Sequence, residues 1–183
     1  MESSTSAEAQ VENPATFQKI EALLQEKGID YKLLIHEPVL TSKAAAEIRG
    51  VPLSSGAKAM LLKDNSKADS MLFTLAVMSA SKKFSWKLVK KLLKVKNMRF
   101  ATPEEVYTVT GCLPGAVPPF GSVFGIGTIL DRSLRAQGET INFNCGLRTH
   151  SVRMRFEDYY ALEKPKFEDV FTEEGEEESV KEE

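Results

Sequence analysis

Two neighbouring apolar segments constrain the fold of this 183-residue chain more than any other feature. Residues 57–64 (AKAMLLKD) and 70–78 (SMLFTLAVM) each have the length of a strand, and a polar turn separates them. Side chains alternate between the two faces of a strand, so Lys58, Met60 and Leu62 share one face of the first segment. Both faces are otherwise apolar, which is typical of a strand covered on both sides. We therefore expect this strand to be covered on both faces.

The remaining pattern mixes helices and strands without a strict βαβ order. A capping box at Thr102, Pro103 and Glu105 predicts a helix that ends at Gly111, and Thr16 is expected to cap an earlier helix. The other expected helices lie at 41–50, 85–94 and 157–163, and the other expected strands at 31–36, 97–101, 125–130, 140–145 and 151–156. This order favours a single α+β domain with a mixed or largely antiparallel sheet.

Charge divides the chain into a basic body and two acidic ends. The net charge is −2, but residues 1–14 carry −3 and residues 168–183 carry −8, which leaves +9 for residues 15–167. We expect disordered tails at 1–14 and 164–183 around a domain at 15–163. A basic body indicates a polyanionic partner, although surface lysines also serve solubility alone. No secretory segment and no apolar run of about 20 residues is visible, so a cytoplasmic protein is expected.

The segment TGCLPGAVPPFGSVFGIG (110–127) holds five glycines and three prolines and no charge. Prolines fix the backbone and remove N–H donors, whereas glycines permit close approach. Such a loop displays backbone N–H and C=O groups at Gly115, Ala116, Val117, Phe120 and Gly121, which could hold a polar ligand or an oxyanion. A structural turn that covers the core is the alternative.

The segment SASKKFSWKLVKKLLKVKNMR (79–99) holds eight basic residues and no acid. Its apolar residues Trp86, Val89, Leu92 and Leu93 recur at helical spacing, which predicts an amphipathic helix. The lysines expected to face outward or flank this helix are Lys82, Lys83, Lys87, Lys90, Lys91 and Lys94. Nucleic-acid phosphates are the natural partner of such a face, with a membrane surface as a rival and a solvated face as the simplest alternative.

Few side chains suggest catalysis on their own. Lys58 stands at the entry of a buried strand, where it either reaches water or points into a pocket. His36 and His150 are candidate acid–base groups because of their imidazole rings, but each alone is more typical of a structural histidine. Two histidines and the two cysteines Cys112 and Cys145 give no metal site and no disulfide framework. We therefore expect no metal and no cofactor.

Several segments in order resemble the YbaK / prolyl-tRNA synthetase-associated domain family of aminoacyl-tRNA deacylases. They are HEPVLTSKAAAEIRG, GAKAMLLKD, SASKK, ATPEEVYTVTGCLPGAVPPFG, LDRSL and INFNCGLRTHSVRM, and they extend from about Phe17 to Phe156. The resemblance implies a mostly antiparallel curled sheet with helices packed outside. It also implies a trans-editing enzyme that hydrolyses the ester of a mischarged tRNA. The amino acid would be small, such as alanine, cysteine or serine, and tRNA-Pro is one candidate tRNA.

The resemblance also implies site residues. Lys58 corresponds to the family's active-site lysine, and Gly115, Pro119 and Gly121 correspond to its pocket loop, so Ala116 and Val117 join the expected substrate-binding set. Where bacterial members carry a Ser-Gly-Gly-Lys-Arg-Gly-like turn, this chain reads NCGLRTHSV, so Thr149, His150 and Ser151 are expected to line the pocket, with His36. The expected partners are aminoacyl-tRNA and prolyl-tRNA synthetase or a multi-synthetase complex, with no membrane.

Two other functions stay open from the sequence. One is a noncatalytic tRNA-binding or synthetase-associated module that keeps the fold. The other is a membrane-surface or protein-docking role for the basic segment. The oligomeric state is not predicted.

Overall fold

The computed structural model describes residues 10–66 and 72–175. Its helices are α1 (Ala15–Glu26), α2 (Ser42–Arg49), α3 (Trp86–Leu93), α4 (Pro103–Thr110), α5 (Arg132–Ala136) and α6 (Phe156–Glu163), with short 3₁₀ turns η1 (Leu53–Ser55) and η3 (Gly121–Phe124). Its strands are β1 (Tyr31–Ile35), β2 (Ala57–Asp64), β3 (Phe73–Ser79), β4 (Lys82–Phe84), β5 (Met98–Phe100), β6 (Gly127–Asp131), β7 (Thr140–Asn144), β8 (His150–Arg155), β9 (Phe167–Asp169) and β10 (Thr172–Glu174).

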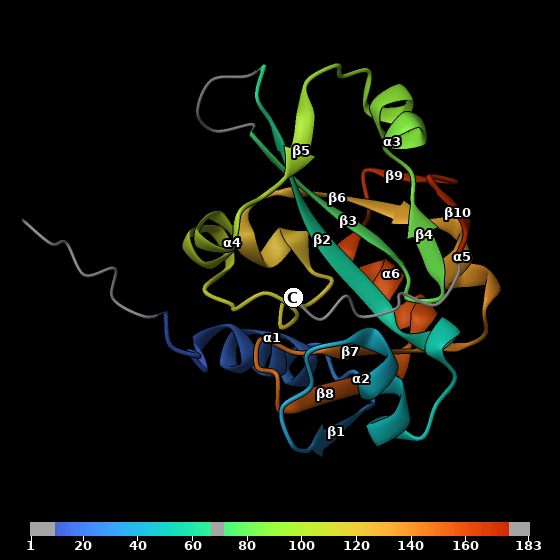
Figure 1. Cartoon of the computed structure of the whole chain (residues 1–183). Helices are drawn as coiled ribbons and strands as arrows, with labels where there is room; N and C mark the ends of the chain where they lie inside the picture. Colours follow the sequence, from blue (N-terminus) through green and yellow to red (C-terminus); the bar gives the residue numbers. More distant parts are fainter. Residues whose placement is uncertain (1–9, 67–71, 176–183) are drawn as a thin grey trace, which may run out of the picture.

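The strands form two main sheets and one short pair (Figure 1). One sheet has the order β1-β8-β7 and is antiparallel throughout. The other has the order β5-β2-β3-β6-β9, in which β3–β6 and β6–β9 are parallel and the other pairs are antiparallel. Strand β10 pairs with β4. The α+β fold with mixed, mostly antiparallel sheets is therefore as the sequence predicted.

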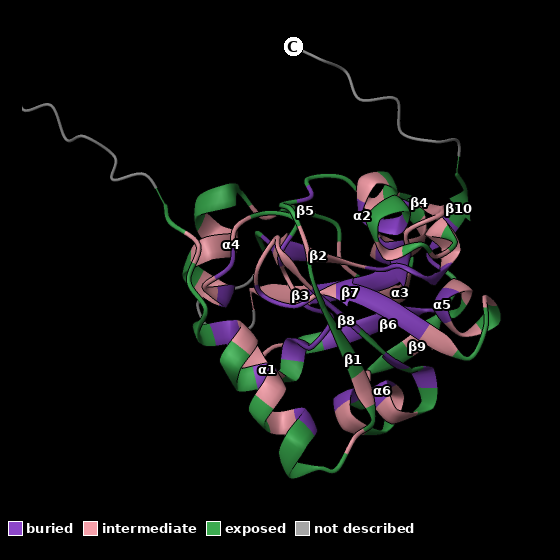
Figure 2. Ribbon diagram, turned by 90° about the horizontal axis from the view of Figure 1, so that it is seen from below, coloured by how far each residue is buried: buried purple, intermediate pink, exposed green. Residues whose placement is uncertain are grey.

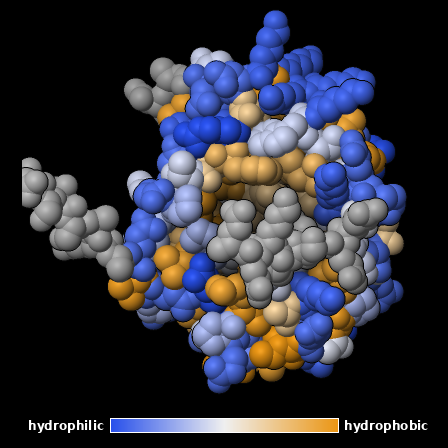
Figure 3. Space-filling view, viewed as in Figure 1, coloured by the Kyte–Doolittle hydropathy of each residue, from blue (hydrophilic) through white to orange (hydrophobic). Residues whose placement is uncertain are grey.

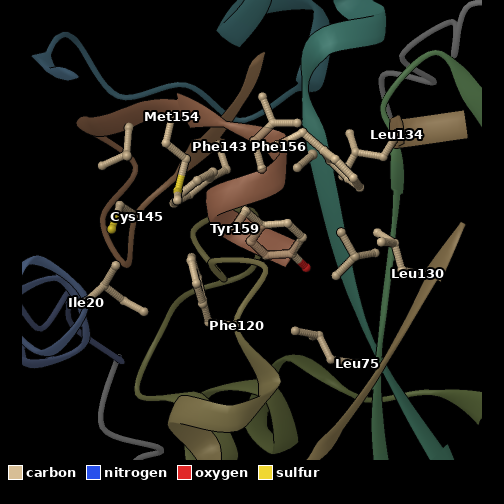
Figure 4. Packing of buried hydrophobic residues seen from close by; sticks show 14 of the residues in the cluster. Ile20, Leu75, Phe120, Leu130, Leu134, Phe143, Cys145, Met154, Phe156 and Tyr159 are labelled. Carbon is tan, nitrogen blue, oxygen red and sulfur yellow. The ribbon is translucent and has the colours of Figure 1, made fainter. Parts of the chain in front are cut away.

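The main core fills the space between the two sheets. It takes Ile141 and Met154 from the small sheet, Leu75 and Leu130 from the large sheet, and Tyr159 from α6. Figure 2 shows β6 and β7 as mostly buried, whereas the edge strand β1 is exposed, and Figure 4 shows Tyr159 among the packed side chains. The Tyr159 hydroxyl donates a hydrogen bond to the Pro119 carbonyl at 2.8 Å, so the glycine–proline loop is attached to this core.

A second core covers the other face of the large sheet. Met60 and Leu62 of β2 pack there with Val89 of α3, whereas Ala57 and Leu61 of the same strand face the main core. The alternation predicted for β2, with both faces covered, is present. The hydrophobic face of α3 accounts for its position, and its lysines lie on the opposite side.

Helix ends agree with the sequence at α4 and differ at α1. Thr102 and Glu105 form the predicted capping box, and Gly111 follows α4 in the left-handed conformation. Thr16 was expected to cap α1, but the helix begins at Ala15, and the Thr16 hydroxyl donates to the Thr110 carbonyl at 2.7 Å. The threonine thus joins α1 to the end of α4, a long-range contact that its local sequence does not encode.

The C-terminal segment corrects an expectation. Residues 164–183 were expected to be disordered, but β9 and β10 lie in this range, and Phe171 between them is fully buried in the second core. The Asp131 carboxylate accepts hydrogen bonds from the Phe171 N–H at 2.7 Å and the Thr172 hydroxyl at 3.0 Å. The sequence contains no signal for this packing, because Phe171 is a single buried aromatic residue among acidic and mostly exposed neighbours. Residues 1–9 and 176–183 of the two expected tails lie outside the described residues.

Other elements were not expected at all: β4, α5 and the 3₁₀ turns η1 and η3 are too short to leave a periodic pattern. In the described ranges 10–66 and 72–175, no helix has the length and hydrophobicity needed to cross a bilayer.

Candidate functional site

A pocket of about 370 Å³ opens where the large sheet is incomplete. Strand β2 pairs with β3 from Ala57 to Lys63, but with β5 only from Leu62 to Asp64. In the described part of the chain, no strand pairs with the β5-side edge of β2 from Lys58 to Met60. Figure 3 shows the hollow on this face, with apolar walls.

Four parts of the chain surround the pocket. Helix α2, the first half of β2, the region from β5 to α4, and the glycine–proline loop contribute most of the wall. The lining residues are Leu40, Thr41, Ser42, Ala45, Ala46, Arg49, Val51, Gly56, Ala57, Lys58, Ala59, Met60, Leu61, Ala80, Phe100, Ala101, Val106, Pro114, Gly115, Val117 and Asn144. Alanines from α2 and β2 leave room for a small group, and Arg49 and Lys58 are the charged residues of this set. Among the described residues, no carboxylate lines the pocket.

Lys58 lies in this wall, as predicted. It is half-buried near the start of β2, directly after η1 and Gly56. Close packing favours glycine at position 56, because an added Cβ would lie 3.1 Å from the Ala80 Cβ. The close approach of η1 to β3 fixes where β2 begins and therefore where Lys58 stands.

Part of the glycine–proline loop forms another wall. Gly115 and Val117 line the pocket as predicted, with Pro114. Gly115 has φ +85°, a left-handed conformation that favours glycine. Its carbonyl accepts a hydrogen bond from the Asn144 amide at 2.8 Å, and the Pro114 carbonyl accepts two from the Arg148 guanidinium. Side chains from β7 and the turn after it therefore hold the loop in place.

Three other loop residues predicted to bind substrate lie behind the pocket wall. Ala116 is fully buried, and its carbonyl accepts a hydrogen bond from the Gly146 N–H at 2.8 Å. Pro119 is bound by Tyr159 as described above, and Gly121 packs tightly against Thr128. None of the three is among the lining residues. One side of the loop faces the pocket and the other packs against the core. These three residues lie on the side that packs against the core.

The polar residues predicted after β7 also lie outside the lining set. Thr149 and His150 contact each other at 2.8 Å, and the His150 ring packs on Phe17 of α1. Ser151 is buried, and its hydroxyl lies 2.7 Å from His36 Nε2. These four residues do not meet the pocket directly.

The residue that links Ser151 to the pocket was missed by the sequence analysis. Arg49, in the last turn of α2, donates from Nε to the Ser151 hydroxyl and from Nη2 to Asn144 Oδ1, each at 2.8 Å. Burial lowers the pKa of Arg49 to about 10, and no carboxylate of the described residues pairs with it. Asn144 therefore connects Arg49 with the Gly115 carbonyl. A lone Arg at a helix end has no local signature, so the sequence held no signal for it.

The two cysteine thiols are poorly placed for catalysis. Cys112 and Cys145 are both fully buried and carry free thiols, and burial raises the pKa of each thiol. Neither is suited to act as a nucleophile. No group of three or more His, Cys, Asp or Glu residues within 10–66 and 72–175 could hold a metal ion.

The basic helix lies against the rim of the pocket. Phe100 lines the pocket, and its ring lies 4.5 Å from the Trp86 ring at the start of α3. Lys83, Lys87, Lys91 and Lys94 are exposed, while Lys90 lies over the Trp86 ring. Lys82 differs from the expectation of a solvent-facing lysine, because Glu174 of β10 forms an ion pair with it.

Comparisons with known proteins agree with this geometry. The model of the aminoacyl-tRNA editing domain family matches residues 36–162. A curated relative from Escherichia coli K12, the multifunctional Ser/Thr-tRNA deacylase ProXp-y, is 31% identical over 150 residues, which cover 82% of this chain and 89% of the relative.

Solved structures share the fold. A hypothetical protein, APE2540, has a TM-score of 0.73 at 25% identity and covers 85% of this chain and 99% of its own. A candidate trans-editing enzyme for prolyl tRNA synthetase also has a TM-score of 0.73, at 22% identity, and covers 87% and 98%. Aminoacyl-tRNA editing, the class of activity that the resemblance implied, is confirmed at the level of the family. This chain belongs to the aminoacyl-tRNA editing domain family.

Proposed function

We propose that this protein is a trans-editing deacylase that hydrolyses the ester of a tRNA mischarged with a small amino acid. The observation that supports this most is the pocket of about 370 Å³, which combines small apolar walls with two cations and no described carboxylate. The walls suit a small side chain, and the cations suit the phosphate-bearing 3′ end of a tRNA.

The pocket limits the candidate amino acids. Ala45, Ala46, Ala57 and Ala59 supply much of the wall, so alanine, cysteine and serine are the first candidates. The name of the E. coli relative adds threonine to the panel. Thr41, Ser42 and Asn144 offer polar groups that can bind a side-chain hydroxyl. We include tRNA-Pro among the candidate tRNAs and prolyl-tRNA synthetase among the candidate partners. One structural neighbour, the candidate trans-editing enzyme for prolyl tRNA synthetase, supports this choice.

Lys58 and the loop have distinct roles in the proposed reaction. Lys58 binds the terminal phosphate or ribose and places the ester in the pocket, while backbone groups at Gly115 and Val117 hold the aminoacyl group and the attacking water. Ester hydrolysis passes through a tetrahedral oxyanion, which fixed N–H donors stabilise. The cysteines are buried and His150 is not among the lining residues. Proton transfer is therefore assigned to the terminal adenosine of the tRNA, as the family resemblance implies.

The proposed tRNA path crosses α3. The contact between Trp86 and Phe100 places the helix next to the pocket rim, so its exposed lysines can meet acceptor-stem phosphates when the 3′ end enters the pocket. Such contacts are independent of sequence, and affinity falls as salt rises. Lys87, Lys91 and Lys94 are the main candidates, since Lys82 is paired with Glu174.

Deacylation of tRNAs charged with alanine, cysteine, serine, threonine and proline tests the proposal. We expect the wild type to hydrolyse one or two of these esters selectively, and Lys58→Ala to lose at least about 100-fold in kcat/KM, as truncation of a charged substrate contact does. Lys32→Ala is the matched control, because Lys32 is exposed on β1 outside the pocket lining.

The alternative function is a noncatalytic tRNA-binding module. Hydrolysis of no ester in the panel, together with salt-dependent tRNA binding, would refute the deacylase proposal for these substrates and support the module. Equal activity of wild type and Lys58→Ala would remove Lys58 from the site but leave the reaction in place.

A further inference from the structure

Within the described residues, the Arg49 guanidinium uses one of its two hydrogen-bonding edges. Nε and Nη2 share one edge of the planar group, and this edge is occupied by Ser151 Oγ and Asn144 Oδ1, each at 2.8 Å. The other edge, formed by Nη1 and the second Nη2 hydrogen, makes no hydrogen bond with residues 10–66 or 72–175. Two parallel N–H groups on one edge match two oxygens of a phosphate or carboxylate.

The occupied edge holds the group rigidly. Ser151 is buried and lies 2.7 Å from His36 Nε2, while Asn144 also donates to the Gly115 carbonyl at 2.8 Å. Both partners are thus fixed on their far side. A guanidinium fixed in this way loses little conformational freedom when its second edge binds a ligand.

No carboxylate of residues 10–66 or 72–175 forms an ion pair with Arg49. Arg49 is half-buried, and a cation that is partly removed from water is stabilised by an anionic partner. Arg49 lines the pocket with Lys58, and no carboxylate of the described chain lines it. An anionic ligand is therefore a suitable partner for Arg49.

We propose that the second edge of Arg49 binds the non-bridging oxygens of the phosphodiester between the last two nucleotides of the tRNA acceptor end. This inference rests on the proposed function, since it assumes that aminoacyl-tRNA enters this pocket. The phosphates are the anionic groups of an aminoacyl-tRNA before reaction, and each offers the oxygen pair that a planar fork requires. With Arg49 at the phosphodiester, Lys58 is left for the terminal ribose and the ester.

The oxyanion that forms at the ester carbon is the alternative ligand for the second edge of Arg49. Substrates of two lengths distinguish the phosphodiester from the oxyanion. An aminoacyl minihelix contains the phosphodiester, whereas a 2′(3′)-O-aminoacyl adenosine contains the ester and no phosphate. The amino acid is the one that the wild type hydrolyses best. We expect Arg49→Gln to lower kcat/KM about 10- to 100-fold on the minihelix, mainly through KM, and less than about twofold on the aminoacyl adenosine.

Three variants serve as controls. Arg49→Lys keeps the charge but not the two parallel N–H groups, so its kcat/KM on the minihelix should lie between those of the wild type and Arg49→Gln. It also tests the assignment if Arg49→Gln does not fold. Ser151→Ala removes one brace but not the cation and should change the minihelix reaction less than Arg49→Gln does. Arg153→Gln removes an exposed charge from β8 and should behave as wild type. Equal losses of Arg49→Gln on both substrates, or a loss on neither, would overturn the assignment.

A direct titration separates this inference from the proposed function. The dinucleotide cytidylyl-(3′,5′)-adenosine carries the phosphodiester without any ester, and adenosine is its phosphate-free partner. We expect Arg49→Gln to weaken dinucleotide binding at least about tenfold and to leave adenosine binding unchanged. A wild type that hydrolyses no ester but shows this pattern would refute the deacylase and keep the Arg49 site. No difference between wild type and variant with the dinucleotide would refute the Arg49 site, whatever the enzymatic result.

Discussion

Gly121 shows how one residue behind the pocket wall fixes the shape of the glycine–proline loop. Its N–H donates to the Thr128 hydroxyl at 3.2 Å, and the next residue, Ser122, donates from its N–H to the Glu163 carboxylate at 3.1 Å. Glu163 also accepts a hydrogen bond from Thr128, and burial raises the pKa of its carboxyl. A Cβ at Gly121 would collide with the Thr128 hydroxyl and lie 2.9 Å from the Ile126 carbonyl. Close packing is thus sufficient to require glycine at this position.

Gly121→Ala should therefore act mainly on stability. We expect the free energy of unfolding to fall by about 1–3 kcal/mol, as overpacking of a tight site does. Gly115→Ala is the comparison, since its Cβ would meet nothing closer than 3.9 Å and its cost comes from φ +85° alone. Chemical denaturation of both variants measures this, and a neutral Gly121→Ala would contradict the packing account.

At the scale of elements, helix α4 is joined to the large sheet by Glu105. The carboxylate closes the capping box of α4, and it also binds Arg99 of β5 at 2.7 Å and Lys63 of β2 at 2.6 Å. These hydrogen bonds, with Arg99 the largest contributor, hold the pKa of Glu105 well below its usual range. Val106, the next residue of α4, lines the pocket. The ion cluster therefore sets the position of one pocket wall.

Glu105→Gln should reveal this cluster in the pH dependence of stability. Because the folded-state pKa is lowered, the stabilisation is present above the unfolded pKa of about 4.3 and is lost as pH falls below it. We expect the variant to be less stable than wild type by about 1 kcal/mol at pH 7, since the cluster is partly exposed to solvent. The gap should narrow below about pH 4.

Thermal unfolding of Glu105→Gln from pH 3 to pH 8 measures the gap. Glu104→Gln is the matched control in the same helical turn, because Glu104 is exposed. A gap that stays constant down to pH 3 would show that the Glu105 charge does not stabilise the fold.

At the scale of the whole molecule, the chain builds two cores that share the large sheet. The main core joins this sheet to the β1-β8-β7 sheet, and the second core lies under α3. The C-terminal segment completes the second core, because β9 extends the large sheet and Phe171 fills the space beneath β4 and α3. The surface that carries the lysines of α3 therefore depends on residues about 80 positions later in the chain.

Phe171→Ala should destabilise the protein strongly although its segment reads as an acidic tail. We expect a loss of about 3–5 kcal/mol in the free energy of unfolding, typical of truncating a fully buried phenylalanine. Val170→Ala is the matched control, since the Val170 side chain is half exposed, and it should change stability by less than about 0.5 kcal/mol. Similar effects of the two substitutions in a denaturation series would place Phe171 outside the core.

Local patterns in the sequence determined much of this protein. Alternation predicted that β2 is covered on both faces, the capping box predicted α4, and helical spacing predicted that Trp86, Val89, Leu92 and Leu93 face the core. The order of motifs predicted the family. The resemblance named Lys58 and Gly115 and the composition of the loop named Val117, and all three line one pocket. These signals lie in short segments, where backbone periodicity and residue type suffice.

Only the tertiary structure decided which polar residues reach the pocket. Arg49 and Asn144 lie 95 positions apart and meet through one hydrogen bond, while Ala116, Pro119 and Gly121 turn their contacts toward the core. The same holds for Phe171, whose burial depends on β4 and α3 rather than on its acidic neighbours. A side chain's environment is set by what packs against it from distant segments, and a one-dimensional pattern carries no record of those contacts.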